Sequence, residues 1–338
     1  MKKVLVTGAT GFLGRRVVLQ LVEQGFAVRA LVRQTSNIQG LHLPGVEFVY
    51  GDVTNLGSLQ LAFTDIDYVI HAAAGTSGTE EQMRRVTIEG TRNILDLCRR
   101  SAACKLVYIS SCSVYGIAGQ PDSALLDESA PLEAQPQLRG AYSLTKLEAE
   151  KLVTAAMEQG DVIATILRPG TIYGPGGENY TPMVGFSLKN KLFVVIDRKG
   201  FVLPLVYVDN LVDAIILAMT ADSSSGQVYH VVDTDQVDKK TYMNTFIRKL
   251  HPGAVCLYFP YKLFAAIVAV QEKVFGVLRR EPVISMYRLE SSQNPVVYDV
   301  AKIKSELGWE PGVGFGEAVE ETLKFCLAQS TQRSQRKP

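Results

Sequence analysis

Residues 3–14 read Lys-Val-Leu-Val-Thr-Gly-Ala-Thr-Gly-Phe-Leu-Gly, and this stretch decides the fold of the 338-residue chain. Its first five residues predict a short, buried parallel strand. Glycines follow with GxxGxxG spacing, and the apolar residues at 17, 18, 21 and 22 then predict a helix. Glycine in such a turn lets the backbone approach a pyrophosphate, which the first N–H groups of the helix can bind. The stretch therefore predicts dinucleotide binding, through Gly8, Thr10, Gly11, Phe12, Leu13 and Gly14.

The next predicted strand, Ala27–Val32, indicates which dinucleotide binds. In NAD-binding domains of this architecture an acidic residue near the end of this strand binds the ribose 2′-hydroxyl. Here Arg33 and Gln34 follow the strand, with no Asp or Glu nearby. The planar guanidinium of Arg33 suits a 2′-phosphate, and Arg15 is a second candidate. The sequence therefore favours NADP(H), with NAD(H) as the alternative.

Further strands are predicted at 47–50, 67–71 and 105–110, with helices near 56–63 and 80–100 between them. This alternation predicts an α/β fold with a doubly wound parallel sheet. Asp52 and Val53 follow the third strand, where they are expected to approach the adenine. His71 ends the fourth strand and is interpreted as positioning the backbone, because no second ligand at a suitable spacing indicates a metal. The small residues Ala72, Ala73 and Ala74 then let the chain pass close to the cofactor.

A candidate proton-transfer pair lies downstream, at Tyr142 and Lys146. Residues four apart share one face of a helix. A tyrosine has a pKa of roughly 10, which a neighbouring ammonium lowers. Such a pair can pass a proton to or from a carbonyl or alcohol oxygen. Three serines at the end of the fifth strand, Ser110, Ser111 and Ser113, compete to hydrogen-bond that oxygen.

With these pieces in order, the chain resembles the extended short-chain dehydrogenase/reductases over nearly its whole length. It is most similar to their 3β-hydroxysteroid dehydrogenase and dihydroflavonol-reductase-like branch. The matching segments are Thr7–Gly14, Gly51–Val53, His71–Ala73, Ser110–Ser111, Val114–Gly116, Tyr142 with Lys146, Arg168–Gly170, Tyr173–Gly174, Tyr207–Asn210 and Leu307–Pro311.

The resemblance implies roles for these residues. Tyr142 would be the general acid/base, and Lys146 would lower its pKa and hold the nicotinamide ribose. Ser111 fits the catalytic serine best, and Ser113 is the reserve candidate. The segment bordering the nicotinamide would be Pro169, Gly170, Thr171 and Ile172. Thr87 departs from the family, which usually has Asn there, so any contact that needs asparagine is in question. The family also implies a homodimer, through helices near 81–100 and 141–157.

The carboxyl-terminal half is expected to choose the substrate. Sugar-nucleotide enzymes of the family usually have an arginine shortly before the Tyr207 segment, to bind a diphosphate. Leu203 takes that place here, although Arg198 and Lys199 are nearby. The segment 291–293 likewise reads Ser-Ser-Gln in place of a second arginine. We therefore expect an NADP(H)-dependent oxidoreductase for ketones, aldehydes or alcohols on a small hydrophobic substrate that is steroid-, flavonoid- or polyketide-like. The alternatives are a nucleotide-sugar epimerase or dehydratase, and a cofactor-binding protein without turnover.

A mainly apolar helix is predicted over 260–279. Residues 271–273, Gln-Glu-Lys, interrupt it, and a membrane-spanning helix needs roughly 20 apolar residues. Three interpretations remain open. The helix is a lid over an apolar substrate pocket, a subunit contact or part of the core, or a weak contact with a membrane surface.

Composition fits this scheme, with 47% hydrophobic and 20% charged residues. The net charge of +1 gives no reason to expect nucleic acid. Five scattered cysteines without CxxC or a secretion signal indicate a cytoplasmic protein. The expected domains are a Rossmann domain (1–171 and 203–232), a smaller, mainly helical substrate-binding domain (172–202 and 233–328) and a flexible tail (329–338).

Overall fold

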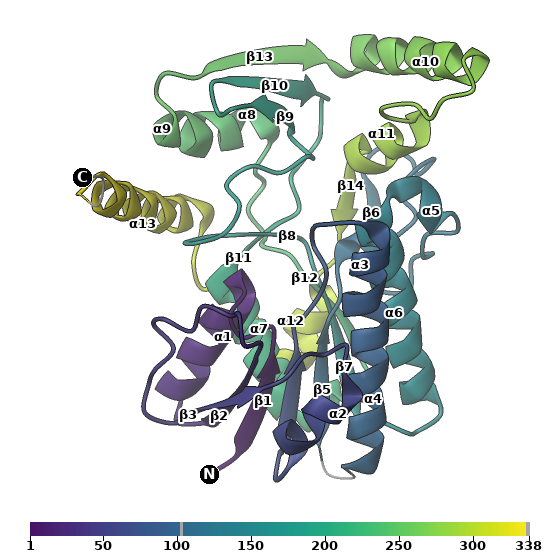
Figure 1. The fold of residues 1–338 in the computed structure, drawn as a ribbon. Coiled ribbons are helices and arrows are strands. Elements are labelled where there is room, and N and C mark those ends of the chain that lie inside the picture. The colour runs from purple at the N-terminus through teal and green to yellow at the C-terminus, as the bar shows by residue number, and fades with distance from the viewer. Residues whose placement is uncertain (102–103, 336–338) are drawn as a thin grey trace.

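The computed structural model describes residues 1–101 and 104–335, and its centre is a seven-stranded parallel sheet (Figure 1). The strand order is β12-β7-β5-β4-β1-β2-β3. The strands are β1 (Lys3–Thr7), β2 (Ala27–Val32), β3 (Val46–Tyr50), β4 (Tyr68–His71), β5 (Lys105–Ile109), β7 (Ala164–Pro169) and β12 (Val228–Val231). β5 and β7 are buried along their whole length, as apolar strands covered on both faces should be. The predicted doubly wound α/β fold is confirmed.

Helices cover both faces of this sheet (Figure 1). On one face lie α1 (Phe12–Glu23) and α7 (Val208–Thr220), which share a hydrophobic core with β1 and β2. The other face is covered by α2 (Leu56–Leu59), η1 (Gln60–Phe63), the π-helical turn η2 (Arg85–Glu89), α4 (Gly90–Arg100) and α6 (Ala141–Glu158), while α3 (Glu80–Arg84) packs on η2 and α6. The strand order changes direction between β4 and β1. Ligands of such sheets bind at the carboxyl ends of the strands at this point.

A second layer of structure lies above those carboxyl ends (Figure 1). Its three-stranded sheet has the order β13-β10-β9, with β9 (Gly185–Leu188) antiparallel and β13 (Val255–Pro260) parallel to β10 (Leu192–Asp197). Its helices are α8 (Lys239–Tyr242), η5 (Met243–Ile247), α9 (Arg248–Leu250), α10 (Tyr261–Val277) and α11 (Met286–Gln293). The apolar helix predicted over 260–279 is α10. The small sheet adds to the mainly helical organisation that the sequence predicts.

Two short parallel pairs connect the layers. β8 (Thr171–Tyr173) pairs with β11 (Leu205–Tyr207), and β6 (Ala124–Leu126) pairs with β14 (Val296–Tyr298). The remaining short elements are η3 (Cys112–Val114), α5 (Pro136–Arg139), η4 (Asp222–Ser224) and α12 (Ala301–Leu307). The predicted domain division stays a prediction. α12, which it assigns to the substrate domain, lies against β12 of the main sheet.

The last helix, α13 (Phe315–Gln335), extends into the expected tail, whose predicted flexibility stays a prediction. The flexible tail predicted over 329–338 is helical through Gln335, and residues 336–338 lie outside the described residues. The physical reason is that the segment holds good helix formers such as Gln and Arg, and no glycine or proline before Pro338.

Candidate active site

The glycine turn after β1 lies against the end of β4. Gly8 has a φ of +70°, and a Cβ added there would lie 2.8 Å from the Ala73 nitrogen. A Cβ on Gly14 would lie 2.1 Å from the Gly8 carbonyl oxygen. Among the described residues no side chain caps the N-terminus of α1, so its first N–H groups remain available to a ligand. This cradle, which any side chain would fill, fits a dinucleotide pyrophosphate.

A buried chain of hydrogen bonds holds the cradle in place. Thr7 Oγ1 lies 2.7 Å from His71 Nδ1, and His71 Nε2 lies 3.1 Å from Thr91 Oγ1. Thr91 donates its only proton to the Thr87 carbonyl, so His71 must donate through Nε2 and accept from Thr7 through Nδ1. Burial also lowers the pKa of His71, to about 3, which keeps it neutral. His71 therefore joins β1, β4 and α4, in keeping with a positioning role.

Thr87 takes part in this region as well. Its hydroxyl accepts a hydrogen bond of 2.9 Å from the Gly75 nitrogen. The contact ties the loop after β4 to the π-helical turn η2, so threonine at this position still anchors the backbone near the cofactor cradle.

The other predicted cofactor residues lie around this cradle. Phe12 packs against the backbone of Gly177, while Leu13 and Val53 are buried in the hydrophobic cores. Asp52 is half-buried and accepts hydrogen bonds from the nitrogen and the hydroxyl of Thr54. The predicted contacts of Asp52 and Val53 with adenine remain predictions.

The two candidate arginines for a 2′-phosphate behave differently. Arg15 donates to the carbonyls of Thr10, Asn37 and Gln39, so its guanidinium is occupied in holding the loop after β2. Arg33 is exposed, and its guanidinium forms no hydrogen bond with any of the described residues. Of the two, Arg33 is the one placed to bind an added anion.

Tyr142, Lys146 and Ser111 meet near the end of β5. Tyr142 and Lys146 lie one turn apart on α6, and Lys146 Nζ donates a hydrogen bond of 2.7 Å to the Ile109 carbonyl. Ser111 caps η3 by accepting from the Ser113 nitrogen at 3.1 Å, and its hydroxyl acts to lower the pKa of Tyr142. The reserve candidate Ser113 has a buried hydroxyl with no hydrogen-bond partner among the residues described. The structure thus brings Ser111, more than Ser113, to Tyr142.

The pKa values at this site correct one expectation. Burial raises the pKa of Tyr142 above its ordinary value, while the hydrogen bond with Ser111 opposes this rise. Burial lowers the pKa of Lys146 to about 8, against the opposing charge of Glu150. The expected lowering of the Tyr142 pKa by Lys146 is therefore wrong for the protein chain alone. The reason is that burial dominates for both groups, while the ammonium is directed at the Ile109 carbonyl.

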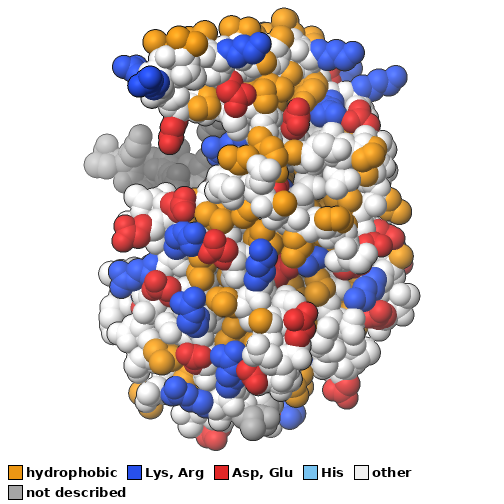
Figure 2. All heavy atoms as spheres, turned by 90° about the vertical axis from the view of Figure 1, so that its right-hand side faces the viewer, with side chains coloured by type: hydrophobic (Ala, Val, Ile, Leu, Met, Phe, Trp, Pro, Cys, Tyr) orange, Lys and Arg blue, Asp and Glu red, His pale blue; other side chains and the backbone are white. Residues whose placement is uncertain are grey.

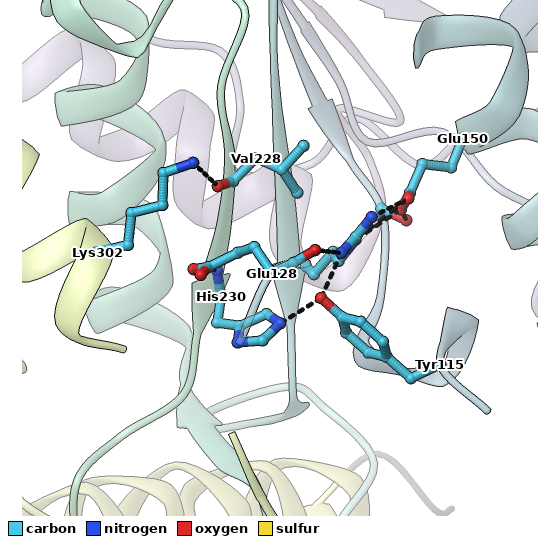
Figure 3. A network of polar contacts seen from close by, with 8 residues as sticks. Tyr115, Glu128, Glu150, Val228, His230 and Lys302 are labelled. Atoms are coloured by element: carbon cyan, nitrogen blue, oxygen red, sulfur yellow. Dashed lines mark hydrogen bonds and ion pairs between the residues drawn. The ribbon is translucent and has the colours of Figure 1, made fainter. Parts of the chain in front are cut away.

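A buried polar network joins α6, the helix that carries Tyr142 and Lys146, to the main sheet (Figure 3). Glu150, one turn beyond Lys146 on α6, forms a 2.6 Å ion pair with Arg168 of β7 and accepts a hydrogen bond from Ser110. Arg168 also donates to the Tyr115 hydroxyl, whose other partner is His230 Nε2. Because His230 Nδ1 lies 2.8 Å from the Asp299 carbonyl, Nδ1 carries the proton and Nε2 accepts from Tyr115.

The network was not anticipated from the sequence. Glu150 and His230 were not candidates, and Arg168 and Tyr115 entered only as matches to family motifs. The signal available was the spacing of 142, 146 and 150, which places three functional groups on one helix face. The network fixes α6 against β5 and β7, and thereby the positions of Tyr142 and Lys146.

The segment expected to border the nicotinamide follows β7. A Cβ on Gly170 would lie 2.2 Å from the Pro204 carbonyl oxygen, and the Thr171 nitrogen donates to that oxygen at 2.6 Å. Pro169 ends β7, and Ile172 lies in β8. Between the layers lies a mostly apolar cavity of about 110 Å³, lined by Leu203, Pro204, Asp233, Tyr298 and their neighbours. It includes none of the three proposed catalytic residues, and pockets for drug-sized ligands measure roughly 300 Å³ or more.

Two cations near the position of Leu203, Arg198 and Lys239, already bind other groups of the protein. Leu203 is buried, and Arg198 donates to Asp122, Gln293 and Asn294 while stacking 4.4 Å from the Tyr261 ring. The buried Lys239 donates to the Ile196 carbonyl and to Gln293. Of the two substitutes considered, Lys199 is exposed and Arg198 is already paired.

A glycine cradle at the switch point of a doubly wound sheet, beside a Ser-Tyr-Lys cluster, defines a dinucleotide-dependent enzyme. The comparisons with known proteins agree. The model of the NAD dependent epimerase/dehydratase family matches residues 4–231. The chain belongs to this family, the extended short-chain dehydrogenase/reductases, and is an NAD(P)-dependent oxidoreductase.

Curated relatives match nearly end to end. The 2-alkyl-3-oxoalkanoate reductase of Stenotrophomonas maltophilia is 28% identical, over 97% of this chain and 99% of its own. The human short-chain dehydrogenase/reductase family 42E member 1 is 31% identical, over 91% of this chain and 84% of its own. The human sterol-4-alpha-carboxylate 3-dehydrogenase, decarboxylating, is 27% identical, over 96% and 88%.

Solved structures share the fold. The crystal structure of gox2253 superimposes with a TM-score of 0.80 at 25% identity, covering 100% of both chains. The UDP-glucose 4-epimerase of Thermotoga maritima gives a TM-score of 0.74 at 19% identity, covering 97% of this chain and 99% of the other. The second likeness concerns the fold alone.

Proposed function

We propose that the protein is an NADP(H)-dependent oxidoreductase that interconverts a ketone or aldehyde and an alcohol on a small hydrophobic molecule. The observation that carries the proposal is the meeting of Ser111, Tyr142 and Lys146 at the carboxyl end of β5, next to the glycine cradle. Such residues supply proton transfer and hydrogen bonding to an oxygen that changes its protonation during the reaction.

Each residue has a part that follows from its surroundings. The bound nicotinamide cofactor would supply or accept the hydride. Tyr142 lies near the start of α6 and is 36% exposed as a residue, although burial of its hydroxyl raises its pKa. In the reductive direction Tyr142 donates its proton to the carbonyl oxygen, and Ser111 hydrogen-bonds the same oxygen. A charged Lys146 would stabilise the tyrosinate that results, and the raised pKa of Tyr142 would ensure that it begins the step protonated.

The preference for NADP(H) rests on Arg33. Its guanidinium is exposed and unpaired among the described residues, while the strand β2 ends with no carboxylate for a ribose 2′-hydroxyl. Replacing Arg33 by alanine should raise the KM for NADPH by about tenfold or more, because one charge-assisted interaction with the 2′-phosphate is lost. The KM for NADH should stay nearly unchanged. The matched control is Arg92→Ala, an exposed arginine on α4. Equal KM changes for both cofactors would contradict the preference.

The hydrophobic substrate class has two supports. Relatives are named for a 3-oxoalkanoate, a 3-beta-hydroxysteroid and a sterol carboxylate, which are largely apolar molecules. Arg198 is paired and Leu203 is buried, so among the described residues neither position supplies a free arginine for a sugar diphosphate.

The test is turnover of a substrate panel with NADPH and NADH. Ketosteroids, 3-oxoalkanoates, flavonoids and nucleotide sugars would be compared by the loss of nicotinamide absorbance and by product analysis. We expect turnover of apolar ketones, and a fall of about 10²-fold or more in Tyr142→Phe, which keeps the ring and removes the proton. Activity on nucleotide sugars alone would overturn the substrate class, and full activity of Tyr142→Phe would overturn the mechanism.

A further inference from the structure

The outer face of the small sheet is apolar throughout, and α10 covers only the end of it at Ile196. In its register, Leu188, Leu192 and Val255 form one row, and Phe186, Val194 and Leu257 form the next. The alternate residues of the same strands, such as Phe193 and Val195, are fully buried against the hydrophobic core. A sheet with one face on the core usually presents polar residues on its other face. Here both faces are apolar, and the side chain of Leu257 is 51% exposed.

Helix α10 continues this surface. Val268 is its one buried residue, and it packs with Ile196 and Leu289. The opposite side exposes Leu263, Ile267, Val270, Val274 and Val277. The ring of Phe264 lies 6.2 Å from that of Phe186 and 6.0 Å from that of Phe259, so strand and helix form one surface. We call it the apolar platform: the outer face of β9, β10 and β13 together with the exposed side of α10.

Positive charge surrounds the platform. Segments 185–197 and 255–281 hold the six cations Lys189, Lys191, Lys262, Lys273, Arg279 and Arg280 and three acids, Asp197, Glu272 and Glu281. All six cations are exposed, and none forms an ion pair with a described residue. Glu272 accepts a hydrogen bond of 3.2 Å from the Met286 nitrogen. Figure 2 shows hydrophobic side chains along the upper edge of the molecule, with Lys and Arg side chains beside them.

The charge decides between the possible occupants. A second copy of the chain docked face to face would bring unpaired cations against like cations. A lid would need the apolar side of α10 turned inward, whereas that side faces solvent. An anionic lipid surface satisfies both features, because acyl chains accept the apolar side chains and headgroups pair with the cations. Among the described helices none has the length and apolar character to cross a bilayer.

We propose that the apolar platform docks the protein onto the surface of a membrane that contains anionic lipids. The platform lies in the layer above the carboxyl ends of the main sheet, so docking would bring the substrate side of the enzyme close to the lipid (Figure 1). The proposal rests on the platform alone and is independent of the reaction at Tyr142.

The experiment is co-sedimentation of the purified chain with vesicles at low salt, without cofactor or substrate. One set of vesicles contains phosphatidylcholine alone, and the other contains about one-third phosphatidylserine. We expect the protein to partition at least about tenfold more strongly to the second set, and added salt to weaken this partitioning. Leu257→Glu with Ile267→Glu should reduce that partitioning by about tenfold or more, as should Lys189→Glu with Lys191→Glu. The matched control is Leu61→Glu, because Leu61 is 76% exposed on η1, outside the platform.

Three outcomes would overturn the proposal. They are failure of the wild type to bind anionic vesicles, equal binding to phosphatidylcholine alone, and an equal loss in Leu61→Glu. Size-exclusion chromatography with light scattering adds a fourth. A dimer that Leu257→Glu dissociates would assign the platform to a second copy of the chain. All substituted side chains are exposed, and unchanged thermal unfolding would show that the variants are folded.

Discussion

At the scale of single residues, Glu150 is the residue that most strongly supports the active site without contacting a substrate. Its carboxylate is 1% exposed and its partner Arg168 is 6% exposed, so both charges are out of water and depend on each other. Its position four residues after Lys146 makes it the anchor of the helix that carries Tyr142.

We therefore expect Glu150→Ala to lower the free energy of unfolding by about 3–5 kcal/mol, because it leaves the Arg168 charge buried and unpaired. Chemical denaturation measures this directly. The matched control is Glu148→Ala on the same helix, since the Glu148 carboxylate is 35% exposed and pairs with Arg84 at 2.7 Å. That exposed pair should contribute about 1 kcal/mol or less. Equal losses in the two variants would show that the buried network is not an anchor.

Lys146 leads to a prediction about pH. Burial lowers its pKa from 10.5 to about 8 in the folded chain, whereas the unfolded chain keeps the ordinary value. Between these values the unfolded state binds more protons, so the stability should rise with pH by roughly 3 kcal/mol from this group. Unfolding free energies of the wild type and of Lys146→Met, measured across the pH range between these two pKa values, should therefore differ. The variant should lack the rise in stability that Lys146 contributes. The exposed Lys151→Met should keep the wild-type slope, and the same slope in Lys146→Met would refute the shift.

At the scale of elements, sequence reasoning succeeds where the determinants are local. The β1–turn–α1 unit is predicted in full because strand, glycines and helix are consecutive. The sheet β13-β10-β9 could not be predicted, since it pairs 192–197 with 255–260 across distant parts of the chain. The Ser110–Glu150–Arg168 network is likewise formed by three elements that only the fold brings together. The prediction that Lys146 lowers the Tyr142 pKa was wrong for a related reason, because the spacing of two residues does not show how deeply they are buried.

The glycine turn makes its own prediction. Gly14→Ala places a Cβ 2.1 Å from the Gly8 carbonyl oxygen. The turn must therefore open, and the cofactor cradle is distorted. We expect binding of NADPH, measured by its fluorescence or by calorimetry, to weaken by about 10²-fold or more, because the backbone groups of the turn would no longer be positioned to contact the cofactor. Gly276→Ala is the control, because nothing lies within 4 Å of a Cβ there. Unchanged binding in Gly14→Ala would contradict the assignment of the cradle.

At the scale of the whole molecule, Asn210 connects segments far apart in the chain. Its side chain donates to Asp233 Oδ1 and to the Val313 carbonyl, both at 2.9 Å, and accepts from the Val313 nitrogen at 3.0 Å. Its own carbonyl accepts from the indole of the buried Trp309. One residue of α7 therefore holds the end of β12 and the approach to α13. The predicted homodimer and cytoplasmic location belong to this scale as well and stay predictions.

Replacing Asn210 by alanine should therefore loosen the molecule as a whole. The change leaves acceptors on Asp233 and Val313 and a donor on Val313 without partners, and each buried unsatisfied group costs about 1–3 kcal/mol. We expect a loss of at least about 3 kcal/mol in unfolding free energy, together with faster hydrogen exchange in 309–313. Asn93→Ala, which removes a single 2.8 Å hydrogen bond to the Val53 carbonyl, should cost about 1 kcal/mol. Equal stability of the two variants would show that Asn210 does not hold α7, β12 and the 309–313 segment together. The motifs at 207–210 and 307–311 would then contribute to the structure independently of each other.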